Sequence, residues 1–289
     1  MRVEESLAAK KRLVEGELDR VLSKEDSLLF RAMRYAVFSG GKRFRPLLLL
    51  SSGACFGGRR RVLLPFACAL ELVHNYSLIH DDLPAMDNDD FRRGRPSCHK
   101  AFGENIALLA GDGLLTLAFE LMAGANVPPE LVQRKQQALR TVSRAAGVSG
   151  MIGGQFLDIT LNPEKLTGEV LEELVTKKTG ALIAASVEVG AVLAGAGRRE
   201  RKAIADFGRY LGLAFQVRDD ILDSGKKGAK KGPRRPDYAA FLGVDKAKRR
   251  LEELVHKAVA SLDKASLRAE ELRYLALSLV ARKPEESYG

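Results

Sequence analysis

Two clusters of aspartates, each directly behind an apolar segment, are the residues of this chain best suited to chemistry. In the first, residues 81–90, five carboxylates fall within ten positions after the apolar run 70–79. The second, residues 219–223, follows the apolar segment 210–217. Neighbouring carboxylates repel one another, so such clusters are costly unless a cation lies between them. Two of them, each at a helix end, predict one site with carboxylates on opposing walls.

The spacing within each cluster fits a hard cation. Asp219 and Asp223 are four residues apart and share one helical face, whereas Asp220 points about 100° away. Mg²⁺ is usually held by one or two carboxylates together with substrate phosphates. Asp81 and Asp87 are six apart with a proline between them, so we expect a bulge or a helix end there. The alternative for each cluster is a capped helix end with solvated carboxylates.

Basic residues follow or flank these clusters, and each could also belong to a surface ion pair. They are Lys42 and Arg45 behind a Gly-Gly turn, Arg92 and Arg93 behind the first cluster, and Lys177 and Lys178 inside an apolar helix. Metal-binding carboxylates facing Arg and Lys are what a diphosphate group requires, because Arg pairs with phosphate oxygens bidentately. The chain has no GxxxxGK[ST] loop and no kinase motif. We therefore expect diphosphate to be a leaving group and not a phosphoryl donor.

The composition and the helical spacing of apolar residues predict an all-α protein. Hydrophobic residues make up 46% of the chain, which is ample for a core, and only 6% are aromatic. No linker divides the sequence, so residues 1–289 are expected to form a single domain. Gly111 and Gly113 are expected to interrupt one of its helices. The expected helices, ten or more in number, cover residues 3–22, 28–38, 47–55, 64–79, 102–122, 128–146, 150–161, 171–193, 201–222, 246–262 and 269–281.

The charge and the cysteine content indicate where in the cell the protein is located and which classes of partner it binds. No uninterrupted apolar stretch reaches the roughly 18 residues of a membrane span. The charged first twenty residues do not resemble a signal peptide. Three cysteines without metal-ligand spacing are expected to be reduced in a cytoplasmic protein. The net charge is +10, and six of the ten residues 226–235 are basic. Without nucleic-acid-binding motifs, this run indicates a solvated loop or attraction of a polyanionic substrate.

Five motifs together resemble those of trans-isoprenyl diphosphate synthases, with the bacterial farnesyl diphosphate synthases nearest. They occur in the family's order between about residue 31 and residue 250. Any one alone is weak evidence, because terpene cyclases also carry a DDxxD motif. The five are GGKRFRP at 40–46, DDxxxxD with RRG at 81–94, GGQ at 153–155, Lys178-Thr179, and FQxxDDxxD at 215–223.

The resemblance implies a fold, a reaction and partners. The fold would be long helices around a deep central cavity, in a homodimer. The enzyme would join isopentenyl diphosphate to an allylic diphosphate, dimethylallyl or geranyl, and release diphosphate. About three Mg²⁺ ions would stabilise the departing group. The apolar helices would keep water from the allylic carbocation, which water would otherwise hydrolyse.

The resemblance also implies roles for individual residues. Magnesium would be held by Asp81, Asp82, Asp87, Asp219 and Asp223. The allylic substrate would be contacted by Arg92, Lys178, Thr179 and Gln216. Isopentenyl diphosphate would be bound by Lys42, Arg45, His74 and Arg93, with Gly41 permitting close approach of the backbone. The residues acting directly in catalysis would be Asp81, Asp82, Asp87, Lys178 and Asp219.

The sequence leaves two questions open, namely the chain length of the product and the role of the basic loop at residues 226–235. Tyr76, with its neighbour Ser77, lies five residues before Asp81, roughly 7.5 Å deeper on the helix. An aromatic residue there marks C15 producers in the family, and the alternative is a C20 synthase. The lysine motifs expected after the second cluster are not intact, although Lys230 or Lys231 could replace one of them. A non-catalytic member that binds a partner synthase is therefore a further alternative.

Overall fold

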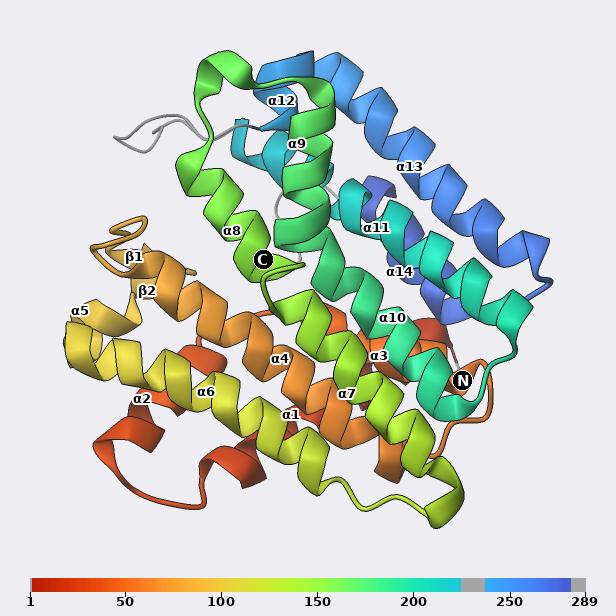
Figure 1. Cartoon of the computed structure of the whole chain (residues 1–289), viewed down its shortest axis with the longest axis horizontal. Helices are drawn as coiled ribbons and strands as arrows, with labels where there is room; N and C mark the ends of the chain where they lie inside the picture. Colours follow the sequence, from red (N-terminus) through yellow and green to blue (C-terminus); the bar gives the residue numbers. More distant parts are fainter. Residues whose placement is uncertain (1, 225–236, 282–289) are drawn as a thin grey trace. The chain divides into compact units, whose positions relative to one another are not determined.

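The computed structural model describes residues 2–224 and 237–281, and these are almost entirely helical (Figure 1). The predicted all-α class is therefore confirmed. The basic run at 226–235, with Lys230 and Lys231, lies outside the described residues. The chain divides into two compact units, one made chiefly of Met1–Leu50 and Arg59–Lys135 and the other of Ser51–Gly58 and Gln136–Ser287. The expectation of one domain over residues 1–289 stays a prediction.

The first unit is built around α4, which is apolar nearly all round. Its residues from Phe66 to Val73 are all buried, including the charged Glu71. Helix α6 lies along α4, and α1, α2 and α5 also contact it. The helices of this unit are α1 (Val3–Leu22), α2 (Leu28–Val37), α3 (Phe44–Ala54, which runs into the second unit), α4 (Arg60–Asp82), α5 (Cys98–Phe102) and α6 (Glu104–Gly124).

A short hairpin in the first unit was not predicted, because two-residue strands have no detectable alternation. Strand β1 (Phe91–Arg92) pairs antiparallel with β2 (Arg95–Pro96), with Arg92 opposite Arg95. The two turn residues, Arg93 and Gly94, have φ of 52° and 76°. Positive φ at both positions is the type I′ geometry that matches the twist of a hairpin. The turn fixes the directions in which Arg92 and Arg93 leave the backbone.

The second unit is centred on the long helix α11, which packs against α10 and α13. Helices α9 and α10 are joined without a loop by a π-helical turn, η3 (Thr176–Gly180). Gly212 of α11 approaches this turn closely, because a Cβ atom there would lie 2.6 Å from the Cα of Gly180. The first unit also holds η1 (Pro129–Leu131). The elements of the second unit are α7 (Val132–Ala146, entered from the first unit), α8 (Met151–Thr160), η2 (Pro163–Lys165), α9 (Gly168–Val175), η3, α10 (Ala181–Ala194), α11 (Arg198–Ser224), α12 (Tyr238–Leu242), α13 (Val244–Lys264) and α14 (Glu270–Ala281).

The expected interruption at Gly111 and Gly113 is wrong, since α6 is continuous through both. A Cβ atom on Gly111 would come within 2.1 Å of His80 Nε2 on α4. This glycine therefore lets two helices approach each other and does not end one. Among the described helices, α4 and α6 are long and apolar enough to span a membrane, but 72% of the apolar window in α4 is buried within the protein, against 33% in α6.

Candidate active site

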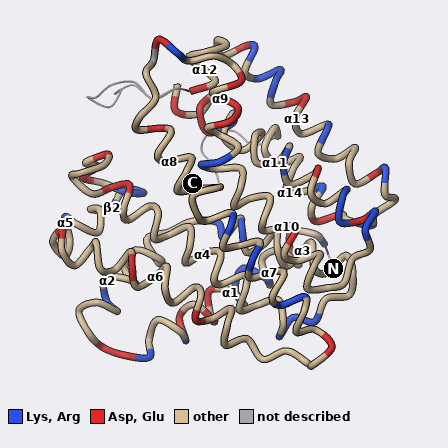
Figure 2. Tube along the Cα trace, viewed as in Figure 1, with Lys and Arg blue, Asp and Glu red and all other residues tan. Residues whose placement is uncertain are grey.

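The first acidic cluster begins at the end of α4, as the spacing of its carboxylates predicted. Helix α4 ends at Asp82, and the chain turns back so that the backbone N–H of Asp87 donates to the carbonyl of Asp81 at 2.8 Å. The carbonyl of Leu83 accepts from two further residues of the turn. Asp81 and Asp87 are thus neighbours although six positions separate them. Figure 2 shows the acidic residues gathered along this loop, between α4 and β1.

Asp82 has a different environment from the other carboxylates of the cluster. It is only 2% exposed, and Arg92 Nε donates to its two oxygens at 3.0 and 3.1 Å, with a further bond from Nη2. Burial disfavours the charge on Arg92, but the hydrogen bonds and charge of Asp82 raise its pKa overall. Arg92 therefore pairs with both carboxylate oxygens of Asp82.

The Gly-Gly turn before α3 receives the other arginine of the hairpin. Gly40 and Gly41 have φ of 123° and 108°, and Arg93 Nη1 donates to the Gly40 carbonyl at 2.6 Å. A Cβ atom on Gly41 would lie 2.7 Å from Arg93 Nη1. The group that approaches Gly41 closely is the Arg93 side chain, and close approach of a substrate to the Gly41 backbone stays a prediction. The turn joins the Arg93 side chain to the loop that carries Lys42.

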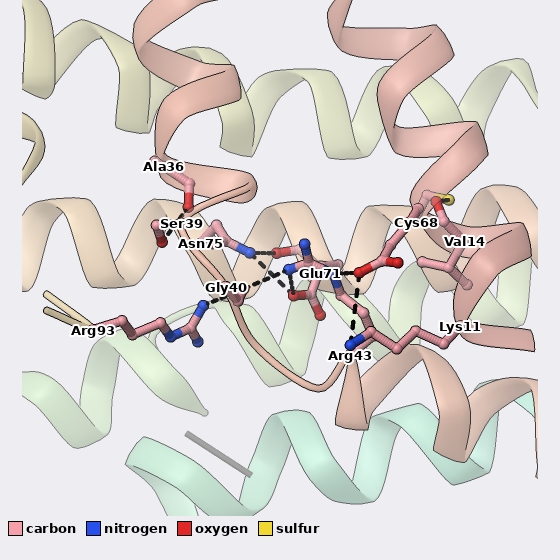
Figure 3. A network of polar contacts seen from close by, with 11 residues as sticks. Lys11, Val14, Ala36, Ser39, Gly40, Arg43, Cys68, Glu71, Asn75 and Arg93 are labelled. Atoms are coloured by element: carbon pink, nitrogen blue, oxygen red, sulfur yellow. Dashed lines mark hydrogen bonds and ion pairs between the residues drawn. The ribbon is translucent and has the colours of Figure 1, made fainter. Parts of the chain in front are cut away.

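A buried ion pair fixes the same loop from the other side (Figure 3). Arg43, with φ of 55°, donates from Nη1 to Glu71 Oε1 of α4 at 2.9 Å and to the Gly40 carbonyl at 3.1 Å. Asn75 donates to Glu71 Oε1 at 3.3 Å. Sequence reasoning missed Glu71, although a lone acid inside the apolar run 70–79 was a usable signal. A charge in such a run requires a buried partner.

His74 lies two turns before Asp81 on α4, and the positive charges of several arginines act on it. Its pKa is held well below the usual range, first by burial and then by the charges of Arg45, Arg93, Arg92 and Arg43. Three residues assigned to isopentenyl diphosphate, His74, Arg45 and Arg93, are therefore close enough to interact electrostatically. A neutral imidazole among guanidinium groups can donate a hydrogen bond to an anion without being charged.

Tyr76 lies one turn before His80 on α4, and its ring meets the His80 ring edge-on at a centroid distance of 5.7 Å. The residue is 5% exposed, and its hydroxyl has no hydrogen-bond partner in the described part of the chain. Burial, with a smaller contribution from Asp81, raises its pKa to about 12. Ser77 is half-buried and donates to the His74 carbonyl at 2.9 Å. Most of the Tyr76 side chain is therefore buried.

In the second unit the predicted Lys178 and Thr179 lie on the π-helical turn η3. The sequence showed only that basic residues interrupt an apolar helix there, and π-turns often occur at functional sites. Lys178 Nζ pairs with Asp158 of α8 at 2.6 Å. Gly154 of α8 packs on the backbone of the turn, since a Cβ atom there would lie 2.2 Å from Lys178 N. Asp158 was not predicted; it follows the GGQ motif by one helical turn.

The second acidic cluster is connected to the same turn by hydrogen bonds. Thr179 Oγ1 lies 2.7 Å from Gln216 Oε1, and Gln216 Nε2 donates to Asp220 Oδ1 at 2.8 Å. Asp220 Oδ2 accepts from the backbone N–H of Tyr238 at 2.8 Å. Burial raises the pKa of Asp220 to about 6, although both hydrogen bonds oppose the shift. Asp219 is half-buried and Asp223 is exposed, so these two carboxylates are the more accessible to a cation.

The donor set suits Mg²⁺ better than a softer metal. All candidate ligands are carboxylates, the oxygen donors that hard cations prefer. Within the described residues, no group of three or more His, Cys, Asp and Glu side chains could hold a metal alone.

Replacement of Gly154 by alanine is expected to lower turnover about tenfold or more, because the new methyl group would displace the backbone that carries Lys178. Gly16→Ala is the matched control, since a Cβ atom on Gly16 has nothing within 4 Å. Turnover and thermal unfolding of both variants are the measurements. Equal turnover of Gly154→Ala and Gly16→Ala would show that the position of Lys178 does not matter.

Comparison with known proteins agrees with this geometry. The polyprenyl synthetase family model matches residues 26–238, most of the chain. The chain belongs to the polyprenyl synthetase family. It is 41% identical to the farnesyl diphosphate synthase of Geobacillus stearothermophilus over 97% of this chain and 98% of the relative. It is 39% identical to the geranylgeranyl diphosphate synthase of Cyanophora paradoxa over 87% of each chain.

Solved structures of polyprenyl synthetases show the same fold. The crystal structure of an FPP/GFPP synthase from Zymomonas mobilis has a TM-score of 0.87 and 34% identity, covering 96% of this chain and 99% of that one. The geranyltransferase of Legionella pneumophila has a TM-score of 0.86 and 36% identity, covering 96% of each chain. The family suspected from the five motifs is therefore confirmed.

Proposed function

We propose that this polyprenyl synthetase condenses isopentenyl diphosphate with dimethylallyl or geranyl diphosphate to give farnesyl diphosphate, releasing diphosphate. The observation that carries the proposal is the end of α4. There Asp81 and Asp87 lie next to each other at the end of the helix. His74 of the same helix lies close enough to several arginines for their charges to lower its pKa. Cation-binding carboxylates at the end of one helix, with guanidinium groups from the neighbouring segments around it, suit two diphosphates. The relatives named farnesyl diphosphate synthase support the product.

Each group of residues has a proposed task. Asp81 and Asp87, with Asp219 and Asp223, would hold Mg²⁺, which when bound neutralises the charge that develops on the departing diphosphate. Lys178 would neutralise part of the same charge. Lys42, Arg45 and Arg93 would hold isopentenyl diphosphate. Arg92 would bind the allylic diphosphate while its pair with Asp82 sets its direction. The sequence assigned Asp82 to the metal, and we propose this positioning role in its place.

The reaction then follows from where charge develops. Loss of diphosphate from the allylic substrate leaves a carbocation, and the double bond of isopentenyl diphosphate attacks it. A proton is lost from the adduct, and the released diphosphate is its acceptor. The apolar helix α4, buried along most of its length, supplies a wall that excludes water near the reacting carbons. When the pure protein receives Mg²⁺ and both substrates, diphosphate should be released. Release at the same rate without isopentenyl diphosphate would contradict the proposal.

Tyr76 is proposed to set product length. Tyr76→Ala should shift the product from C15 towards C20 or longer, because removal of a buried ring opens space roughly 7.5 Å below Asp81. Ser77 shares the proposed chain-length role with Tyr76, so the control is Tyr35→Ala, which removes a ring of α2 that packs against Phe102 and should leave the product unchanged. Chain length is read by chromatography of the dephosphorylated products. A parent that makes mainly C20, like the relative from Cyanophora paradoxa, or an unchanged spectrum in Tyr76→Ala, would contradict this role.

We further propose a cytoplasmic homodimer. Helix α6 exposes Leu108 and Leu109 to 47% and 53%, although it is among the most apolar helices of the chain. A second copy covering this face would remove that apolar surface from water. The proposed location rests on the three cysteines, which are free in the described residues and which a reducing compartment would keep as thiols. Leu109→Glu should lower the mass measured by light scattering from that of two chains to that of one.

A further inference from the structure

We propose that Glu15, on the first helix of the chain, is a positioning residue for the turn that carries Lys42 and Arg45. Its carboxylate acts through Arg43, because Glu15 and Glu71 together hold the Arg43 guanidinium and so fix the turn in the shape that binds a diphosphate. The inference rests on the proposed function for the identity of that ligand. The contacts of Arg43 rest on the first unit alone.

Arg43 depends on its side-chain contacts because its backbone conformation is unfavourable. Its φ of 55° lies in the left-handed region, which glycine adopts readily and arginine does not. Gly40 and Gly41 of the same turn also have positive φ, at 123° and 108°. A residue other than glycine persists in this region only where its surroundings fix it. The partners of the Arg43 side chain therefore hold the turn in shape.

The backbone of Arg43 also determines where helix α3 starts. Its carbonyl accepts a hydrogen bond from the backbone N–H of Leu47 at 3.0 Å, and the helix begins at the next residue, Phe44. Lys42 directly precedes Arg43, and Arg45 is the second residue of the helix. A change in the conformation of Arg43 would therefore redirect both residues assigned to isopentenyl diphosphate.

The Arg43 guanidinium has two acidic partners, which meet different nitrogens. Nη1 donates to Glu71 Oε1 at 2.9 Å and to the Gly40 carbonyl at 3.1 Å (Figure 3). Nε is buried and makes no hydrogen bond with the described residues, but Glu15 Oε1 lies 3.5 Å from it. Nε and Nη1 direct their protons from different edges of the planar group. Glu71 thus leaves the Nε edge to Glu15.

Neighbouring positive charge is a second reason for Glu15. Arg43 and Arg93 both donate to the Gly40 carbonyl, at 3.1 and 2.6 Å. Burial lowers the pKa of Arg93, Glu71 opposes that shift, and the charge of Arg43 adds to it. Two guanidinium groups at one oxygen atom repel each other. A second carboxylate beside Arg43 offsets this repulsion.

The helix that carries Glu15 is held in place without that residue. Val14 and Leu18 of α1 have no exposed surface. Arg34 of α2 forms an ion pair with Asp19 of α1. The Glu15 side chain itself is 34% exposed, against 2% for Arg43. Glu15 can therefore be changed without detaching α1, and the effect of the change is expected in the turn.

Glu15→Gln is the test variant, because it removes the charge and keeps the shape of the side chain. KM for isopentenyl diphosphate should rise roughly fivefold or more, whereas kcat and KM for geranyl diphosphate should change by less than about twofold. Glu17→Gln is the matched control, since Glu17 pairs with Arg20 of the same helix at 2.6 Å. An unchanged KM for isopentenyl diphosphate, or an equal rise in both KM values, would overturn the proposal.

A double-mutant cycle shows whether Glu15 acts through Arg43. In the double variant Arg43→Met with Glu71→Leu, no guanidinium remains for Glu15 to hold. Adding Glu15→Gln to that variant should change kcat/KM for isopentenyl diphosphate by less than about twofold. The same factor in this background as in the parent would overturn the proposal.

Binding of inorganic diphosphate in EDTA gives a readout that does not need turnover. Without metal the acidic clusters repel the anion, so the basic residues dominate its binding. Calorimetry should give a Kd roughly fivefold or more higher for Glu15→Gln than for the parent or Glu17→Gln. Charge alone predicts the opposite, because loss of an acid near a basic site attracts an anion more strongly.

The direction of the change in Kd therefore decides between positioning and simple electrostatics. An equal or lower Kd in Glu15→Gln would overturn the proposal. If the Kd rises as expected but the parent forms no prenyl product, the proposed function fails and the positioning role of Glu15 stands.

Discussion

Replacement of Asp81 or of Asp219 by alanine should each lower turnover roughly 10³-fold or more while leaving the helical fold intact. Both residues end long helices, and both are half-buried. A carboxylate that holds a cation against a departing diphosphate contributes several kcal/mol in the transition state, and about 1.4 kcal/mol corresponds to a factor of ten. The measurements are kcat at saturating Mg²⁺ and the circular dichroism of each variant.

Two control variants make this result specific. Asp26→Ala removes a carboxylate that is 92% exposed and should leave turnover unchanged. Asp82→Ala removes the buried partner of Arg92, so it should lower thermal stability as well as turnover. If Asp81→Ala or Asp219→Ala kept near-parental turnover, the account of two acidic clusters serving one reaction would be wrong.

Replacement of Glu71 by alanine should lower the free energy of unfolding by up to about 3–5 kcal/mol, because it removes the buried partner of Arg43 and leaves only Glu15, whose carboxylate lies 3.5 Å from Arg43 Nε, as a charged partner. The two side chains are 3% and 2% exposed, and their atoms lie 2.9 Å apart. Since whole domains are stable by only about 5–15 kcal/mol, this variant should be partly unfolded at 37 °C. Urea unfolding monitored by circular dichroism measures the change.

The double variant Arg43→Met with Glu71→Leu is the matched control. It removes both charges and keeps similar volume, so it should recover most of the lost stability. Isopentenyl diphosphate binding should not recover, because the loop that carries Lys42 loses its attachment to α4. A loss below about 1 kcal/mol in Glu71→Ala would show that Arg43 reaches water when Glu71 is gone.

The helices were predictable because they bury one face or all faces, which imposes a helical spacing on apolar residues. Residues 3–22 were expected as a helix and form α1 with the same limits. A helix was expected over the apolar residues 64–79, and α4 is buried from Phe66 to Val73. Local features without such a pattern were not predictable. The hairpin at Arg92–Arg95 and the π-turn η3 depend on contacts with distant segments.

The same distinction applies to the site residues: positions set by local helical geometry were predictable, and positions set by contacts between segments were not. The helix end between Asp81 and Asp87 was predicted because a proline lies between the two acids, and α4 ends at Asp82; their joint role as cation ligands stays a prediction. The bond between Arg92 and Asp82 joins residues ten apart across the loop that follows α4, and sequence spacing does not specify the path of that loop. Asp220 was judged to point away from Asp219, and helical geometry suffices for that. Its acceptance of the Tyr238 N–H depends on how α12 packs, which only the structure shows.

The most direct test of the account is to incubate the pure protein with Mg²⁺, isopentenyl diphosphate and labelled geranyl diphosphate, and to identify the product by its chain length. The account predicts labelled farnesyl diphosphate, formed with one equivalent of diphosphate released. A correctly folded protein that consumed neither substrate would contradict it.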